Sequence, residues 1–227
     1  MRLLAPFLFS PVCTVCRLAS TTSAPLCDYC SVLFTPLSQQ HKCPCGALLW
    51  GTEQHCSQCA FSPPYYHQAF CGYRYHYPLN RLINHYKHHR NMTVEACLKH
   101  LWLEHIKTLH TLPEALIPIP LHWRRRYWRG FNQAHRLALF AAEHTQLPIA
   151  NVLRKIRPTA AQQHKNKQER GRSLHGAFQC LITPLPYQHV ALIDDVLTTG
   201  NTANEAAKTL LRHGVQRVDL WTLAYSF

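Results

Sequence analysis

The stretch VALIDDVLTTGNT, residues 190–202, decides the fold of this chain. Its first four residues form a short apolar run rich in β-branched side chains, which is typical of a buried parallel strand. Asp194 and Asp195 follow at the expected end of that strand. A hydroxyl-rich turn spans residues 198–202, and a helix is expected from about residue 203 to residue 212. The pattern is a strand–turn–helix unit of an α/β protein.

The turn has the chemistry of a phosphate site. Backbone N–H groups at a helix N-terminus lack partners and lie at the positive end of the helix dipole, which favours an anion. Gly200 allows close approach of the backbone, and the neighbouring threonines add hydroxyl donors. Asp194 and Asp195 can accept hydrogen bonds from vicinal hydroxyls or hold a divalent metal. Phosphate and diol together describe a ribose 5-phosphate.

Residues 190–202 resemble the phosphoribosyl-pyrophosphate (PRPP) signature of type I phosphoribosyltransferases. A plain strand–turn–helix corner with a capping Asp is the alternative, but it requires only one of the matching positions. The resemblance implies that both acids hold the ribose hydroxyls, with Mg²⁺ accompanying PRPP, and that they are the catalytic residues of any transfer. The PRPP-binding residues it implies here are Asp194, Asp195, Val196, Thr198, Thr199, Gly200, Asn201 and Thr202.

The charge of the chain is concentrated in one part of the sequence. The 227 residues carry a net charge of +13, and residues 115–193 hold twelve Arg and Lys but only Glu143 and Glu169. A strongly basic segment indicates a polyanionic partner or a phosphate-rich ligand. No apolar run reaches the roughly 20 residues of a membrane span. Leu3 to Phe9 is too short and too Pro-interrupted for a signal peptide, so we expect a cytoplasmic protein.

Eight of the eleven cysteines form four pairs before residue 60. Cys-x-x-Cys turns supply thiolates to tetrahedral structural zinc, and a segment this small needs such a staple to fold. A reduced cluster or a redox pair is the alternative. The third pair has one intervening residue, so His41 or His55 could substitute as a ligand, and consecutive and interleaved pairings both fit. The sequence predicts one or two zinc ions, held by Cys13, Cys16, Cys27, Cys30, Cys43, Cys45, Cys56 and Cys59.

Arginines alternate with aromatic residues directly after a predicted strand at residues 116–120. Arginine binds pyrophosphate through two parallel hydrogen bonds, and aromatic rings stack on the bases of a single strand. A solvated surface loop is the alternative. We predict PRPP contacts from Arg125 and Arg129, and nucleic-acid contacts from Trp123, Arg124, Arg126, Tyr127 and Trp128.

Two further cationic segments are candidates. Lys87 ends a predicted helix, where it either complements the helix dipole or reaches the PRPP site. Residues 154–172 are basic and poor in apolar side chains, which favours an arm or lid over the site, with a solvated surface as the alternative. Arg170 and Arg172 of this arm are predicted to contact nucleic acid.

Taken in order, these segments resemble the ComF/GntX family: a Cys-rich double zinc ribbon at 1–64 joined to a phosphoribosyltransferase-like domain at 65–227, an α/β fold whose parallel sheet has flanking helices. In that family the third Cys pair usually has two intervening residues. Lys87 matches a lysine of the family, and the resemblance implies PRPP binding. ComFC members are implicated in handling incoming single-stranded DNA during natural transformation.

Three functions follow from the sequence and the resemblance. The first is a PRPP-binding protein that handles single-stranded DNA in competence. The second is a true phosphoribosyltransferase with an unknown acceptor, although no general base or base-recognition loop is evident. The third is a PRPP-sensing adaptor whose zinc ribbon docks a helicase or another DNA-uptake protein.

Overall fold

The computed structural model describes residues 12–20, 24–157 and 176–226. Its centre is a parallel four-stranded sheet in the order β1-β6-β5-β2. The strands are β1 (Gln68–Arg74), β2 (Ala115–Pro118), β5 (His189–Leu197) and β6 (Arg217–Tyr225). All four strands run in the same direction, so their carboxyl ends meet at one edge, where α/β proteins bind their ligands.

Helices cover one face of the sheet. They are α3 (Leu79–His89), α4 (Met92–Ile106) and α6 (Gln133–Thr145). Successive strand residues point to opposite faces, so Ile193, Trp221 and Leu223 pack against these helices. Trp221, expected in the core, is fully buried.

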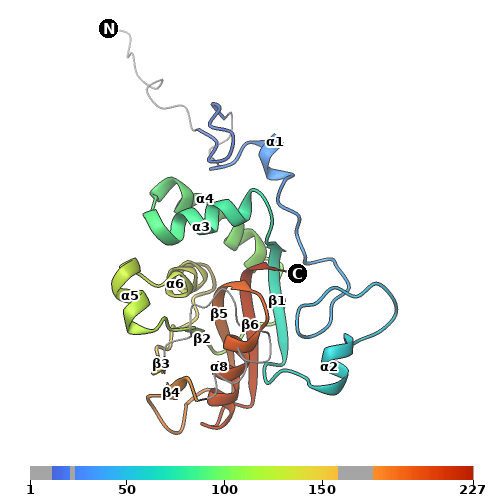
Figure 1. The fold of residues 1–227 in the computed structure, drawn as a ribbon, viewed down its shortest axis with the longest axis vertical. Coiled ribbons are helices and arrows are strands. Elements are labelled where there is room, and N and C mark those ends of the chain that lie inside the picture. The colour runs from blue at the N-terminus through green and yellow to red at the C-terminus, as the bar shows by residue number, and fades with distance from the viewer. Residues whose placement is uncertain (1–11, 21–23, 158–175, 227) are drawn as a thin grey trace.

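The opposite face is covered by α8 (Asn201–Leu211) and by an antiparallel hairpin of β3 (Leu153–Lys155) and β4 (Phe178–Cys180). Leu192 and Leu220 pack here with small residues of α8, including Ala206 and Ala207. Figure 1 shows α5 (Trp123–Arg129) and the hairpin at the β2 side of the molecule, away from β1.

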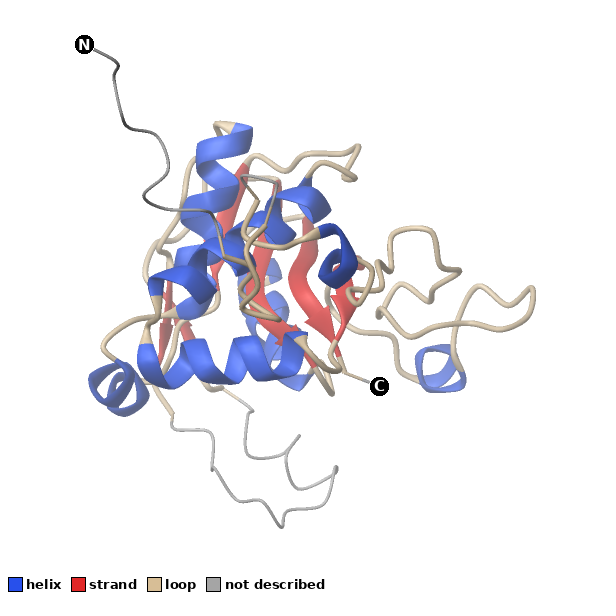
Figure 2. Cartoon of the chain, turned by 90° about the horizontal axis from the view of Figure 1, so that it is seen from above, coloured by secondary structure: helices blue, strands red, loops and turns tan. Residues whose placement is uncertain are grey.

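The Cys-rich segment packs along the β1 side. It contains two short helices, α1 (Asp28–Ser31) and α2 (Ser57–Phe61). Cys13, Leu26 and Phe34 join the core cluster of α3 and α4, whereas Leu37 joins the cluster on the α8 face. In Figures 1 and 2, α2 and its loops lie beside the sheet and form a lateral extension of it. The domain boundary between residues 64 and 65 stays a prediction.

The predicted elements exist, with shifted ends. The strand predicted at 190–193 runs through both acids to Leu197, and the helix predicted from 203 begins at Asn201. The α/β fold of the phosphoribosyltransferase type, with flanking helices and a preceding Cys-rich segment, is confirmed. Of the basic arm predicted at 154–172, residues 158–172, with Arg170 and Arg172, lie outside the described residues, as does the apolar stretch at 3–9.

Candidate functional site

Asp194 and Asp195 lie near the carboxyl end of β5, next to the centre of the sheet. Their side chains point to opposite faces because strand residues alternate. Asp195 faces the helical layer, where the Lys87 ammonium at the last turn of α3 lies 2.6 Å from its Oδ2. The structure therefore brings the predicted lysine to the predicted acid pair.

The two acids differ in their electrostatics. Removal from water raises the pKa of Asp194 to about 7, and the neighbouring Asp195 carboxylate contributes to the rise. The Asp195 backbone N–H, which donates to Asp194 Oδ1 at 2.9 Å, and the cations Lys87 and Lys155 act in the opposite direction. A cation or a hydroxyl donor placed against Asp194 would favour its charged form.

The turn after β5 forms a small polar hollow. It holds a cavity of about 50 Å³ lined by residues 196–203 with Asp194, Leu220 and Thr222. Gly200 caps α8 with φ +72°, a left-handed conformation that favours glycine. The N-terminus of an 11-residue helix opens onto this hollow, so backbone N–H groups and the hydroxyls of Thr198 and Thr199 are available to an anion.

The chain leaves β2 beside the acids and enters the arginine-rich helix. Pro118 pairs with Ile193, and the Ile119 N–H donates to the Ile193 carbonyl at 2.9 Å. The segment predicted to follow a strand end is the helix α5, capped by the His122 side chain at its start and by Gly130 at its end. Register alone therefore places α5 at the same edge as Asp194.

The helix separates its cations by face. Arg125 and Arg129, one turn apart, are partly buried, whereas Arg124 and Arg126 are exposed. Burial lowers the pKa of Arg125, and the charge of Arg129 adds to the effect. Two neighbouring guanidinium groups that repel each other favour an anion between them. Trp123, Tyr127 and Trp128 are 65%, 83% and 86% exposed, which is unusual for side chains of this size.

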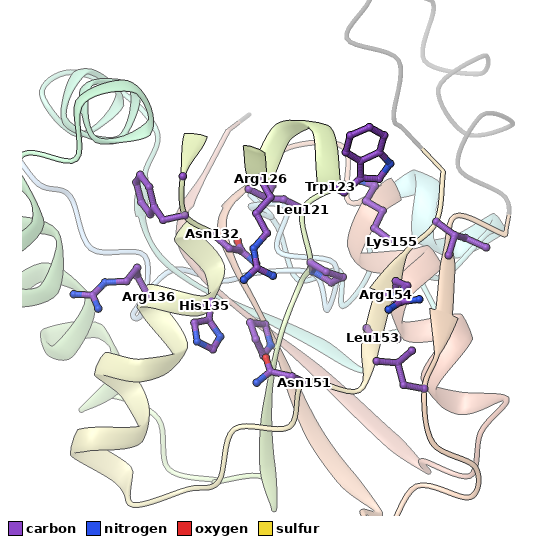
Figure 3. A pocket seen from close by; sticks show the side chains of 16 residues that line it. Leu121, Trp123, Arg126, Asn132, His135, Arg136, Asn151, Leu153, Arg154 and Lys155 are labelled. Carbon is purple, nitrogen blue, oxygen red and sulfur yellow. The ribbon is translucent and has the colours of Figure 1, made fainter. Parts of the chain in front are cut away.

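A cavity of about 910 Å³ lies between α5, the start of α6 and the β3–β4 hairpin (Figure 3). Cationic and polar side chains from all three elements line it, and no carboxylate is among its described lining residues. The labelled lining residues are Leu121, Trp123, Arg126, Asn132, His135, Arg136, Asn151, Leu153, Arg154 and Lys155. The cavity suits a large anionic ligand with flat rings.

Lys155 lines this cavity and also lies near Asp194. Burial lowers its pKa to about 8, the charge of Arg125 adds to the decrease, and the charge of Asp194 opposes it. Lys155 is therefore close enough to both groups to interact with their charges. The sequence assigned Lys155 only to a general basic arm. No local signal marks its position, because the hairpin pairs residues 153–155 with residues 178–180.

The eight cysteines gather into two groups of four, Cys13, Cys16, Cys27 and Cys30 and, separately, Cys43, Cys45, Cys56 and Cys59. Within each group all sulfur atoms lie within 4.8 Å of one another. Cys16 and Cys27 Sγ are 3.9 Å apart, and Cys45 and Cys56 Sγ are 3.7 Å apart. Zn–S bonds of about 2.3 Å in a tetrahedron require sulfur separations of about 3.8 Å. Both groups fit a structural zinc ion, and the pairing is consecutive.

Ionising all four thiols of one group requires a cation among them. Burial and contacts with the three neighbouring thiols raise the pKa of Cys30 to about 12. Burial tends to raise the pKa of Cys13 as well, but backbone N–H donors reduce it to about 6. Four thiolates cannot crowd together without a compensating charge, which Zn²⁺ would supply. His41 is not a ligand of the second group; its Nδ1 lies 3.0 Å from the Gly51 carbonyl.

The fold, the strand–turn–helix hollow and the Cys groups define a phosphoribosyltransferase-like α/β protein with a zinc-ribbon-like N-terminal segment. Competence protein F of Haemophilus influenzae is 34% identical over 188 residues, 79% of this chain and 82% of that protein. DNA utilization protein YhgH of Escherichia coli is 34% identical over 222 residues, 93% and 89% of the two chains. The chain therefore belongs to the ComF family.

A third relative matches a shorter region. Competence protein ComFC of Bacillus subtilis is 35% identical over 99 residues, 44% of this chain and 39% of that protein. No family model matches the chain. Among the helices that the structure describes, none is long and apolar enough to cross a membrane.

Proposed function

We propose that this protein binds PRPP at the edge of its sheet and handles single-stranded DNA in the cytoplasm during DNA uptake. The observation that carries the proposal is the convergence of three features at one edge: the Asp194–Asp195 pair, the phosphate-type turn before α8 and the cationic helix α5. The names of the relatives, competence protein F and DNA utilization protein, support the role in DNA uptake.

Each part of PRPP has a counterpart in this arrangement. The 5′-phosphate would occupy the hollow at residues 198–202. The ribose would lie across the end of β5, with one hydroxyl donating to each carboxylate, because the two acids flank this strand on opposite faces. The pyrophosphate would lie toward Arg125 and Arg129. Mg²⁺ prefers carboxylate and phosphate oxygens, so Asp194 and Asp195 suit it, and it would neutralise the pyrophosphate charge.

Calorimetric titration of PRPP in the presence of Mg²⁺ tests the site. Asp195→Ala removes a carboxylate expected to accept a hydrogen bond, a charged interaction worth about 1.5–3 kcal/mol, so affinity should fall about tenfold to a hundredfold. Glu143→Ala, an exposed carboxylate on α6, makes the same change of charge and should bind like the wild type. Equal affinity in all three proteins would exclude this site.

The DNA part of the proposal is supported by the exposed aromatic face of α5 beside the large cationic cavity. Bases of a single strand stack on exposed rings, and the phosphates require nearby cations. Both lie within one helix here. A duplex would offer its bases only through its grooves, so the single strand is the better match.

A second candidate function is the transfer of ribose 5-phosphate from PRPP to an acceptor. The cavity of about 910 Å³ favours it, because this space adjoins Asp194 through Lys155 and is large enough for an acceptor. The chain's own residues would position the pyrophosphate and place carboxylate charge near the ribose. Screening nucleobases for pyrophosphate release, with and without single-stranded DNA, separates transfer from binding alone.

A further inference from the structure

The second Cys group (Cys43, Cys45, Cys56 and Cys59) lies behind the phosphate-type turn at residues 198–202, and the first group does not. The Pro44 carbonyl, between Cys43 and Cys45, accepts a 2.7 Å hydrogen bond from the Ala69 N–H of β1. A Cβ built on Gly46 would lie 3.2 Å from the Leu197 side chain, the last residue of β5 before the turn. The loop that would hold the second metal therefore contacts the strand that carries the acids.

Tyr66 completes the connection to the turn itself. Its ring is buried, with 4% exposure, and its hydroxyl donates to the Cys45 carbonyl at 3.4 Å. The same hydroxyl lies 3.0 Å from the position that a Cβ on Gly200 would occupy, so the turn rests directly on it. Next to it, the Tyr65 N–H donates to Asn204 Oδ1 in the first turn of α8 at 2.5 Å.

The first Cys group has a different neighbourhood. Thr14 Oγ1 donates to the Thr93 carbonyl at 3.5 Å, and Cys13 and Cys30 pack in the cluster of α3 and α4. Figure 1 shows α1 beside α3 and α4, whereas α2 lies at the other end of the segment, beside β1. The two groups therefore contact different parts of the α/β fold.

We propose that metal binding at the second Cys group positions the phosphate-type turn, with Tyr66 as the positioning residue between Cys45 and Gly200. The turn must keep its N–H groups aimed at one point to hold a phosphate, and a left-handed glycine turn with exposed threonines has little internal support. Tyr66 and Leu197 supply that support from behind. The identity of the ligand rests on the proposed function, but the mechanical link does not.

Cys56→Ser and Cys27→Ser provide a matched comparison, because both residues are helix N-caps in equivalent Cys-x-x-Cys turns. Each variant should lose one zinc ion per chain. In the full-length protein without ligand, Cys56→Ser should increase amide hydrogen exchange at residues 198–204 by roughly tenfold, with residues 133–145 unchanged. Cys27→Ser should leave residues 198–204 as in the wild type and increase exchange near residue 93 instead.

Tyr66→Phe tests the link without removing a ligand. It should keep both zinc ions and the core packing of the ring, yet increase exchange at residues 198–204 and weaken PRPP binding severalfold, roughly threefold to tenfold. Equal exchange at residues 198–204 in Cys56→Ser and Cys27→Ser, or wild-type exchange there in Tyr66→Phe, would overturn the inference. If the wild type itself does not bind PRPP, the proposed ligand is wrong, and the exchange data alone decide the link.

Discussion

At the scale of single residues, the environment of Asp194 is less favourable for a charged carboxylate than that of Asp195. Its pKa of about 7, raised by burial and by Asp195, means that the ligand-free protein holds a proton there that the unfolded chain would release near pH 3.8. The folded state binds more protons between these two values, so the contribution of Asp194 to stability decreases as pH rises from about 4 to about 7. The buried Asp194 carboxylate therefore lowers the stability of the folded protein near neutral pH, and a bound cation or diol would stabilise its charged form.

Asp194→Asn should therefore stabilise the ligand-free protein while abolishing its tight binding of PRPP. The gain in melting temperature should be small at about pH 5 and larger at about pH 8, because only the wild type must ionise a buried group at the higher pH. Differential scanning calorimetry at both pH values measures this.

Asp219→Asn is the control for a buried carboxylate that already has partners. Asp219 is 1% exposed and accepts from Arg217, whose Nη2 lies 3.1 Å from Oδ2, while His189 Nε2 lies 2.7 Å from the same oxygen. The substitution should lower the melting temperature at both pH values, because it removes the negative charge and one of the two oxygens that accept from Arg217. A lower melting temperature for Asp194→Asn than for the wild type at about pH 8 would contradict the conclusion that ionising the buried Asp194 destabilises the ligand-free protein.

Sequence reasoning finds some residues of the site and misses others for a physical reason. Lys87 is a candidate because it matches a lysine of the ComF family, and the structure pairs it with Asp195. Lys155 was not singled out, because its position depends on a hairpin whose strands lie more than twenty residues apart in the chain. Local patterns report residues near a motif in sequence, whereas Lys155 approaches Asp194 only through the fold.

At the scale of elements, α5 shows how helical periodicity sorts one charged run into two functions. A sequence of four arginines and three aromatic residues carries no visible division, and the alternative of a solvated loop was reasonable. Once the segment is helical, Arg125 and Arg129 lie on one side, while the rings of Tyr127 and Trp128 extend into solvent. The helix thus places the arginines suited to pyrophosphate on one side and the rings suited to base stacking on another.

Arg129→Ala should weaken PRPP binding about tenfold or more, since it removes a half-buried cation whose charge has no acidic partner on the helix. Arg124→Ala is the matched control on the same helix. It removes the same charge, but Arg124 is exposed and its guanidinium lies over the Trp123 ring at 5.3 Å. Calorimetry that shows equal losses in the two variants would indicate long-range attraction and not a pyrophosphate contact.

The boundaries of β5 illustrate what element prediction from sequence lacks. The apolar run ends at Ile193, so the sequence predicts a strand that ends there. The structure continues it to Leu197, because Val196 and Leu197 pair with Ala224 and Tyr225 of β6. Long-range pairing extends the strand through the acids, and this places the two carboxylates on opposite faces of the sheet.

At the scale of the whole molecule, the Cys-rich segment and the α/β fold share a core. The cysteine pattern predicted metal binding but left the pairing open, because spacing alone does not say which turns meet in space. The consecutive grouping follows from the tertiary structure, in which one group packs on α3 and α4 and the other on β1.

Metal analysis of the purified protein should give two zinc ions per chain. A strong chelator should remove them and make residues 12–61 sensitive to protease, since the segment has few buried apolar side chains of its own. The strands β5 and β6 should remain resistant, because they belong to the central sheet. One zinc per chain, or a chelated protein that resists cleavage throughout, would contradict the assignment of two structural sites.

The distribution of charge and aromatic surface predicts that single-stranded DNA binds along α5. Trp123→Ala and Trp128→Ala remove stacking surface without a change of net charge, so each should cost about 1–3 kcal/mol of binding free energy with little dependence on base sequence. Affinity should also decrease with salt, by about 0.7 log units per phosphate contact for each log unit of salt. Fluorescence anisotropy of a labelled oligonucleotide measures both. Trp50→Ala, a ring 90% exposed in the Cys-rich segment, is the matched control.

Coupling between DNA and PRPP distinguishes a specific site from the general attraction of a basic protein. If both ligands use the arginines of α5, saturating PRPP should weaken DNA binding, and DNA should weaken PRPP binding by the same factor, because coupling free energies are reciprocal. Sodium chloride at equal ionic strength separates site competition from screening. If Trp123→Ala and Trp128→Ala bind DNA like the wild type and Trp50→Ala binds it more weakly, the DNA site lies in the Cys-rich segment and not on α5.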